Sequence, residues 1–295
     1  MRIRLLGTGT PSPSLKRMGS CYMVEIGRDV ILFDLGPGSY HRMMESGIKA
    51  TQVTHLFFTH LHYDHCCDYA RLVLTRWDQG AGKIPELKVY GPPSTLRMTE
   101  LLFGEEGVFG PDITARVKHQ ASLDIFRARG GVYPRERPAP AVTGLRSGSV
   151  VEGEGWSVTA ASVVHVQPYL ICYGYRLDSP EGSFVYSGDT GPCQAMVELA
   201  KDCDVLVHMC HYLSGTELGG EYGRVCTGHL ELAKLGQEAK VKNLVVSHVT
   251  EQMDVPGVRE RLIREMSEIY EGNLFFGEDL MEIPASSPKP AKLVG

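Results

Sequence analysis

The fold of this chain can be inferred from one stretch, Thr59-His60-Leu61-His62-Tyr63-Asp64-His65. This stretch follows the apolar run His55-Leu56-Phe57-Phe58, so four potential metal ligands stand where a buried strand would end and a helix would begin. His60 and His62, two residues apart on an extended segment, point the same way. Asp64 and His65 lie on a turning backbone and can point elsewhere, so one short segment can supply ligands to two adjacent metal ions. The alternative is a cluster of surface histidines near a strand end.

The composition fits one large domain and argues against several classes of protein. With 295 residues, 43% of them hydrophobic and 22% charged, the chain can bury a large layered core, and we expect one domain with an insertion. A net charge of −5 gives no global attraction for nucleic acid, which we do not expect as a partner. No run approaches about 18 apolar residues, and no long apolar signal region follows Met1. We therefore expect a soluble, cytoplasmic protein that does not enter a membrane.

Residue types that bind metals recur at the ends of successive apolar strands. Besides His60, they are Asp34, His165, Asp189 and His248. A sheet protein gathers such residues at one edge when a site is built there, because the loops carry the chemistry and the strands hold them rigid. His165 alone would be interpreted as a structural histidine. Five such positions, one of them inside a His-x-His-x-Asp-His motif, favour a metal site.

The segment 104–148 interrupts the alternation of strands and helices. Glycine, proline and arginine accumulate there, as in the run from Arg127 to Pro138. Long, weakly periodic segments inside a compact domain are usually functional or mobile, so we expect a lid over the site or an arm at an oligomer interface. Its arginines can bind an anionic substrate group or simply be solvated. The tail 285–295, rich in Pro, Ser and Lys, is expected to be disordered, which leaves 1–284 as the domain.

Together these motifs resemble the metallo-β-lactamase-fold hydrolases over residues 1–284. The resemblance rests on Asp34 in Phe-Asp-Leu-Gly, the complete His60 to His65 motif, His165, Asp189 in Ser-Gly-Asp-Thr, and His248 in Val-Ser-His-Val. It implies an α/β fold, a four-layer αβ/βα sandwich in which two sheets lie back to back with helices outside. It also implies a site for two metal ions at one edge of this sandwich.

The resemblance further implies which residues hold the two metal ions, taken as two Zn²⁺. Each ion would have three ligands of its own, His60, His62 and His165 for one and Asp64, His65 and His248 for the other. Asp189 would bridge the ions, and Asp34 would support the ligands from behind. Mixed imidazole and carboxylate ligands suit zinc, with Mn²⁺, Fe²⁺ or Co²⁺ as replacements.

Within the superfamily the chain is most similar to the branch of ribonuclease Z, the zinc-dependent arylsulfatases and the phosphodiesterases. The opening Leu-Gly-Thr-Gly-Thr-Pro, the spacing from His165 to Gly-Tyr-Arg, and Thr-Gly-His at His229 suggest this branch. Two features depart from it. Ribonuclease Z carries a tRNA-gripping arm after Gly-Tyr-Arg, whereas here the turn 179–182 follows almost at once. That branch also usually has a glutamate where this chain has Met209, so the acidic partner of His229 is absent from its expected place.

The resemblance and the ligand types lead to an expected reaction. Two metal ions about 3.5 to 4 Å apart share a water, lower its pKa towards neutrality and present hydroxide to a bound ester. We therefore expect a binuclear zinc hydrolase of small-molecule phosphodiesters, phosphotriesters or arylsulfates that works through a metal-bridging hydroxide. Asp64 and His229 are the candidate catalytic residues, His229 as general acid. Alternatively, His229 is a structural residue at a helix N-terminus.

Several further expectations concern the substrate and the assembly. The walls of the substrate pocket are expected to include Trp77, Tyr169, His211 and Tyr212. The rival activity is tRNA 3′ processing, with the stretch Arg127–Arg137 replacing the missing arm. Lactone hydrolysis and a non-enzymatic, metal-occupied binding module are further alternatives. By analogy with the family, we expect a homodimer.

Overall fold

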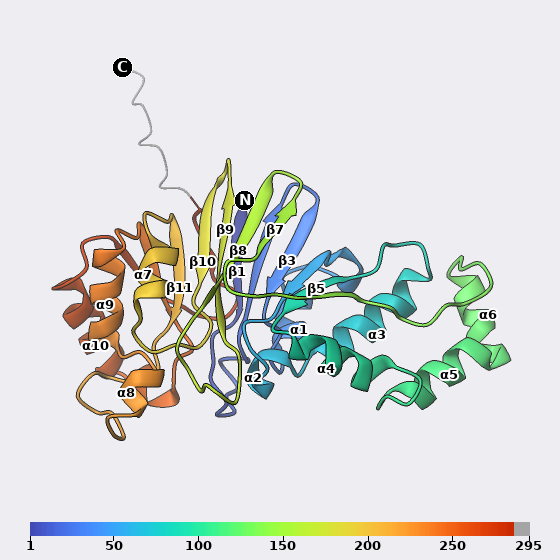
Figure 1. The fold of residues 1–295 in the computed structure, drawn as a ribbon, viewed down its shortest axis with the longest axis horizontal. Coiled ribbons are helices and arrows are strands. Elements are labelled where there is room, and N and C mark those ends of the chain that lie inside the picture. The colour runs from blue at the N-terminus through green and yellow to red at the C-terminus, as the bar shows by residue number, and fades with distance from the viewer. Residues whose placement is uncertain (286–295) are drawn as a thin grey trace, which may run out of the picture.

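The computed structural model describes residues 1–285, which form two seven-stranded sheets packed face to face between outer layers of helices (Figure 1). The strand order is β14-β1-β2-β3-β4-β5-β6 in the first sheet and β13-β12-β11-β10-β9-β8-β7 in the second. This arrangement confirms the expected four-layer α/β sandwich. The expected disordered tail lies, apart from Ala285, outside the described residues.

The first half of the chain builds the first sheet and the helices beside it. Its strands are β1 (Arg2–Gly7), β2 (Cys21–Ile26), β3 (Asp29–Phe33), β4 (His55–Phe57), β5 (Lys88–Gly91) and β6 (Ala141–Gly144), joined at the edge by β14 (Glu282–Ile283). Its helices are α1 (Ser39–Glu45), α2 (Tyr63–Cys66), α3 (Tyr69–Gly80) and α4 (Ser94–Phe103), with a 3₁₀ turn η1 (Ala50–Gln52). The strands β3 to β6 run parallel.

The second half follows a similar plan. Its strands are β7 (Val150–Gly153), β8 (Trp156–Ser162), β9 (Tyr173–Ser179), β10 (Gly182–Tyr186), β11 (Val205–Met209), β12 (Asn243–Ser247) and β13 (Asn273–Phe276). The helices are α7 (Gln194–Ala200), α8 (Tyr222–Val225), α9 (His229–Glu238) and α10 (Val258–Ser267), with a 3₁₀ turn η2 (Glu251–Asp254). The strands β10 to β13 run parallel. In both sheets an antiparallel meander therefore leads into parallel strands.

Strand β3 shows why these segments are almost continuously apolar. Ile31 and Phe33 pack between the two sheets, while Leu32 on the opposite face packs against the helices outside. A strand covered on both faces needs apolar side chains at every position, not at alternate ones. The same layering leaves only the ends of the strands free for polar residues.

The hairpin between β9 and β10 confirms that no arm follows the Gly-Tyr-Arg sequence. Ser179 pairs directly with Gly182, so only Pro180 and Glu181 form the turn.

Among the described residues, no helix is long and apolar enough to cross a membrane.

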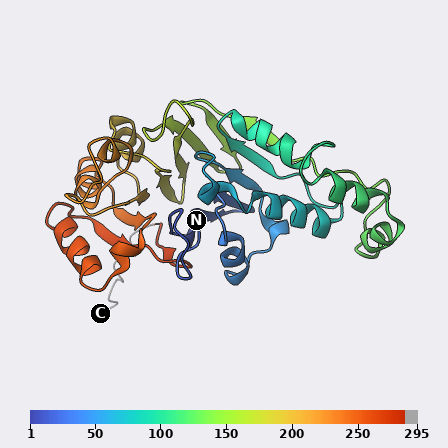
Figure 2. The ribbon, with the colours of Figure 1, turned by 90° about the horizontal axis from the view of Figure 1, so that it is seen from below.

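The insertion 104–148 contains two helices that the sequence did not predict, α5 (Gly110–Lys118) and α6 (Gln120–Ala128). Each is short, and the side chains they bury are few, Ile113 on α5 and Phe126 on α6, so no apolar period is long enough to stand out in the sequence. Both helices project beyond the sheets at the end of the molecule opposite α9 and α10 (Figures 1 and 2). In this structure the part of the insertion that carries α5 and α6 is therefore an arm and does not cover the edge where α2 lies, whereas residues 141–144 of the expected insertion form β6 of the first sheet.

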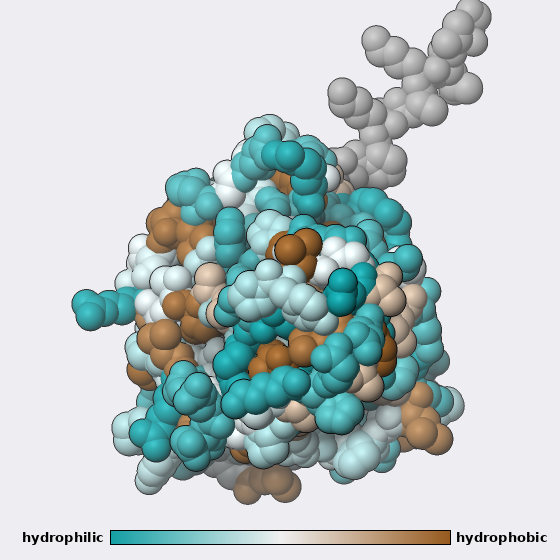
Figure 3. Space-filling view, turned by 90° about the vertical axis from the view of Figure 1, so that its right-hand side faces the viewer, coloured by the Kyte–Doolittle hydropathy of each residue, from teal (hydrophilic) through white to brown (hydrophobic). Residues whose placement is uncertain are grey.

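Three arginines of the insertion, Arg129, Arg135 and Arg137, fasten this arm to α3 and α4. Arg135 is buried, donates to Asp78 over 2.8 Å and lies over the ring of Trp77, and Arg129 also pairs with Asp78. Arg137 donates to the carbonyl oxygens at the end of α4. Figure 3 looks onto this end of the molecule, where brown apolar patches are enclosed by teal polar residues. These arginines are thus neither free anion ligands nor simply solvated.

We expect the Asp78→Ala variant to lose about 3 to 5 kcal/mol of unfolding free energy, because Arg135 would stay buried without a counter-ion. The matched control is Asp112→Ala, which removes an exposed pair with Arg116 and should change stability by about 0.5 kcal/mol or less. Urea unfolding measures both variants. Equal, small losses in the two variants would contradict this role of Asp78.

Candidate metal centre

The two sheets bring their polar strand ends to one place. From the first sheet, Asp34 follows β3, and the stretch 60–65 follows β4 and runs into α2. From the second sheet, three separate segments contribute one residue each: His165 follows β8, Asp189 follows β10, and His248 follows β12. Asp34 and all the predicted ligands except His62 have buried side chains. Segments almost two hundred residues apart therefore meet at the sheet edge.

The seven predicted ligands form two groups, and within each group the ligand atoms lie within 4.8 Å of one another. One group is His60, His62, His165 and Asp189, and the other is Asp64, His65 and His248. Asp189 lies between them, with Oδ1 3.4 Å from Nε2 of His65 and Oδ2 3.3 Å from Nε2 of His248. Its Oδ2 is also 3.8 Å from Nε2 of His165. The carboxylate thus touches members of both groups.

Unpaired buried atoms test whether these residues fit metal ions. Oδ1 of Asp64, Nε2 of His65 and Oδ1 of Asp189 are buried and have no hydrogen-bond partner among the described residues. Leaving one such atom unsatisfied costs about 1 to 3 kcal/mol. Three of them in one cluster of imidazoles and carboxylates fit divalent cations, since these are the donor atoms that zinc and related ions take.

The charges of the cluster also suit a cation. Burial would raise the pKa of Asp189, but the adjacent His248 and His65 outweigh it and hold this pKa well below its ordinary value. For His65, burial would lower the pKa, but Asp189 and Asp34 outweigh it and raise this pKa well above the ordinary range. Burial lowers the pKa of His60 well below its usual value. The carboxylates therefore favour positive charge at the centre, while His60 is held as a neutral imidazole.

Oxygen atoms outside the centre set the orientation of three imidazole rings. Nδ1 of His65 lies 2.7 Å from Oδ2 of Asp34, and Nδ1 of His165 lies 2.8 Å from the carbonyl oxygen of Val225. Nδ1 of His60 lies 3.0 Å from Oγ1 of Thr59. A ring that donates its outer N–H keeps the lone pair of the other nitrogen free for a metal ion. All three rings thus present Nε2 to the centre.

Asp34 holds several of these elements together. It is fully buried and accepts the backbone N–H and the hydroxyl of Thr59, the hydroxyl of Tyr186, and Nδ1–H of His65. Asp34 and His248 also have positive φ angles, 59° and 52°, a conformation that non-glycine residues seldom adopt away from functional sites. Thr59 and Tyr186 were not identified from the sequence, although Thr59 adjoins the motif.

His229 has an acidic partner from an unexpected place. Its Nε2 lies 2.8 Å from Glu265 on α10, and its Nδ1 accepts the backbone N–H of Ser214 over 3.0 Å. Both ring nitrogens of this fully buried residue are therefore occupied. The geometry favours the structural alternative for His229 over a general acid. No local sequence pattern marks Glu265, because 36 residues separate it from His229.

The four predicted pocket residues occupy different places. Trp77 is not brought to the centre: its indole N–H donates to the carbonyl oxygen of Glu136 under the arm. Trp77 lies eight positions after Tyr69 on α3, which carries it about 12 Å along the helix. Tyr169 lies on the loop between β8 and β9 and is 88% exposed, so it encloses nothing. His211 and Tyr212, by contrast, line a cleft of about 260 Å³.

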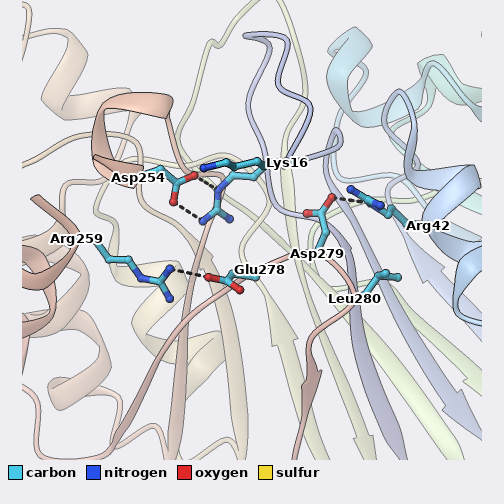
Figure 4. A pocket seen from close by; sticks show the side chains of 8 residues that line it. Lys16, Arg42, Asp254, Arg259, Glu278, Asp279 and Leu280 are labelled. Carbon is cyan, nitrogen blue, oxygen red and sulfur yellow. Dashed lines mark hydrogen bonds and ion pairs between the residues drawn. The ribbon is translucent and has the colours of Figure 1, made fainter. Parts of the chain in front are cut away.

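An ion-pair network fixes the segment that carries His248. It lines a cavity of about 370 Å³ formed by Lys16, Arg17, Arg42, Asp254, Arg259, Glu278, Asp279 and Leu280 (Figure 4). Arg17 is buried, holds both oxygens of Asp254 and donates to Oγ1 of Thr8. The carbonyl oxygen of Thr8 accepts the N–H of Val249, next to His248. The cavity thus belongs to the scaffold of the metal centre.

Comparison with known proteins agrees with this geometry. Residues 15–229 match the metallo-beta-lactamase superfamily. The chain is 29% identical to ribonuclease Z of Mycobacterium sp. (strain KMS) over 299 residues, 99% of each chain. It is 30% identical to ribonuclease Z of Mycolicibacterium paratuberculosis over 294 residues, 98% of this chain and 99% of the relative.

Solved structures share the same fold. The metallo-beta-lactamase fold protein YhfI from Bacillus subtilis has a TM-score of 0.73 at 15% identity and covers 96% of this chain and 98% of its own. The short form of human tRNase Z has a TM-score of 0.66 at 19% identity, with 97% and 100% covered. A diphosphatase of the PhnP family has a TM-score of 0.64 at 16% identity, with 96% and 97% covered. The family match over residues 15–229 shows that the chain belongs to the metallo-beta-lactamase superfamily, and these structures share its fold.

Proposed function

We propose that this protein is a metal-dependent hydrolase of phosphodiester bonds, with small-molecule phosphodiesters as its leading substrates and two Zn²⁺ ions as its cofactors. The observation that carries the proposal is Asp189, whose carboxylate touches members of both ligand groups. A related fold occurs in yeast PDE1, in the diphosphatase of the PhnP family and in tRNase Z. The names diphosphatase and tRNase Z denote enzymes that cleave phosphate linkages, which supports phosphate esters over sulfate esters as substrates.

Some residues of the centre would bind the metal ions, and others orient the ligand side chains. Divalent ions held there would polarise a phosphoryl oxygen and lower the pKa of a water molecule. Asp64 and Asp189 would supply the negative charge that holds such cations, and Asp34 fixes the ring of His65. The cleft beside His211 and Tyr212 is the place for the organic group of the ester.

We expect the zinc-loaded protein to hydrolyse bis(p-nitrophenyl) phosphate, to lose this activity with EDTA and to regain it with Zn²⁺ or Mn²⁺. Release of nitrophenolate measures the rate, and an aryl sulfate, a phosphotriester and a lactone complete the panel. Faster turnover of one of these would reassign the substrate class within the same chemistry. Absence of metal-dependent turnover on every compound would refute the proposed small-molecule activity.

The second candidate is tRNA 3′ processing, because the curated relatives named ribonuclease Z match this chain over nearly its whole length. Two observations favour hydrolysis of small-molecule phosphodiesters over tRNA processing. The β9–β10 turn has no room for an arm, and Arg129, Arg135 and Arg137 are engaged within the protein. Cleavage of precursor tRNA, with binding that weakens steeply as salt rises, would favour the ribonuclease instead.

The homodimer remains a prediction. Light scattering at several protein concentrations measures the mass in solution. A mass of 32.5 kDa, that of one chain, at every protein concentration would rule out the homodimer. The same measurement on Asp78→Ala asks whether an anchored α5–α6 arm matters for assembly.

A further inference from the structure

The ligand histidine His248 is oriented by a different kind of contact from three of the other four. The outer nitrogens of His60, His65 and His165 each meet an oxygen atom. The outer nitrogen of His248, Nδ1, instead lies 3.2 Å from Nδ1 of His211, which follows β11. Two imidazole nitrogens form a hydrogen bond only when one carries a proton and the other offers a lone pair. The pair therefore fixes the tautomers of both rings together.

The position of His248 decides which ring donates. Its Nε2 faces the centre, 3.3 Å from Oδ2 of Asp64 and 3.3 Å from Oδ2 of Asp189. A metal ion there requires the lone pair of Nε2, so the proton of the neutral His248 ring sits on Nδ1. Nδ1 of His211 must then accept this proton in the hydrogen bond. The neutral His211 ring consequently carries its own proton on Nε2.

His211 is held rigidly enough to use that N–H. Its backbone N–H donates to the carbonyl oxygen of Thr227 over 2.9 Å, and its ring lies between those of His248 and Tyr222, at 5.2 and 5.9 Å. Among the described residues the ring makes its hydrogen bond through Nδ1, which leaves Nε2 available to a ligand. His211 also lines the cleft of about 260 Å³, together with Ser12, Tyr222 and Thr250. An anionic oxygen in this cleft would meet an N–H donor beside the second ligand group.

We propose that His211 is the positioning residue of His248 and, through the tautomer that this imposes, the hydrogen-bond donor to an anionic oxygen of the substrate. This inference rests on the proposed hydrolase function. His229 cannot take this part in the observed arrangement, because both of its nitrogens are engaged by Ser214 and Glu265. His211 therefore links metal binding to substrate recognition.

Three substitutions separate the two roles. His211→Ala removes both the acceptor for His248 and the donor to the cleft. His211→Asn keeps an oxygen near the position of Nδ1, so it retains the acceptor but does not reach the cleft. The matched control is His41→Asn, which changes an exposed histidine on α1. Thermal unfolding of the metal-free proteins shows whether each variant folds.

Zinc titration of the metal-free proteins, with equilibrium dialysis, is the first measurement. We expect His211→Ala to weaken one of the two zinc sites about 10- to 100-fold and to leave the other unchanged. His211→Asn should restore most of that affinity while kcat/KM for bis(p-nitrophenyl) phosphate stays low. Wild-type affinity at both sites in His211→Ala, or no recovery in His211→Asn, would overturn the proposal.

Long-range proton–nitrogen NMR of the zinc-loaded wild-type protein is the second measurement, and it needs neither a variant nor a substrate. We expect the Nε2–H tautomer for His211 and the Nδ1–H tautomer for His248. The opposite tautomer of His211 would refute the inference even if the variants failed to fold. If the wild-type protein showed no hydrolytic activity, the proposed function would be wrong. The zinc titration and the NMR spectrum would still test the role of His211.

Discussion

The Asp189→Ala variant should lose at least about a thousandfold in kcat/KM while it keeps its fold. The carboxylate contacts His65, His165 and His248, and it is the group shared by the two ligand sets. Without it the centre loses charge stabilisation of about 4 kcal/mol, within the several kcal/mol that bound metal ions supply. Each 1.36 kcal/mol is worth a factor of ten in rate. The measurements are kcat/KM on a phosphodiester and the zinc content of the purified variant.

Two further substitutions test whether this loss is specific to the metal centre. His65→Ala should behave like Asp189→Ala, because it removes a member of the second ligand group. Asp178→Ala, which changes a half-exposed aspartate paired with Arg176, should leave both rate and zinc content unchanged. Retained activity in Asp189→Ala would overturn the two-metal assignment. A macromolecular partner whose binding survives that substitution would point to the binding-module alternative instead.

The sandwich could be predicted from the sequence because its strands carry a local signal. Runs such as 30–33 and 184–186 are hydrophobic at every position, since both faces of these strands are covered, and each is soon followed by a carboxylate, Asp34 or Asp189. The arm was missed for the opposite reason. Helices α5 and α6 are short and are supported by contacts of the arm with Trp77 and Asp78. The spacing of apolar residues in the sequence does not reveal such contacts.

The ligands could be predicted because they lie at strand ends and inside a dense motif. Their partners could not, because each partner is defined by a contact between distant segments. Tyr186 reaches Asp34 across 152 positions, and Glu265 reaches His229 from another helix. The pocket prediction for Trp77 rests on residue type alone, and α3 carries this side chain away from the motif to the carbonyl oxygen of Glu136. His211 was named only as a pocket residue, whereas its contact with His248 emerges from the fold.

The Asp34→Ala variant should lose about 3 to 5 kcal/mol of unfolding free energy. Four buried donors would lose their acceptor: two on Thr59, one on Tyr186 and one on His65. Each unsatisfied donor costs about 1 to 3 kcal/mol, and water entering the space left by the carboxylate offsets part of the sum. Alanine also tolerates the positive φ of 59° less well than aspartate or asparagine. Urea unfolding of the metal-free protein measures this loss.

The Asp34→Asn variant isolates the effect of Asp34 on the ring of His65. An asparagine oxygen can still accept the N–H of Thr59, the Tyr186 hydroxyl can turn to accept from the amide nitrogen, and the backbone can keep its conformation, so we expect a smaller loss of stability than in Asp34→Ala. Its amide nitrogen, however, would stand 2.7 Å from Nδ1 of His65, where the carboxylate oxygen now lies. Two donors cannot face each other, so His65 would move its proton to Nε2, the nitrogen that a metal ion needs. Zinc affinity at the second site and kcat/KM should therefore fall about 100-fold without a matching loss of stability. Wild-type zinc binding by this folded variant would show that Asp34 supports the fold alone and does not set the ligand.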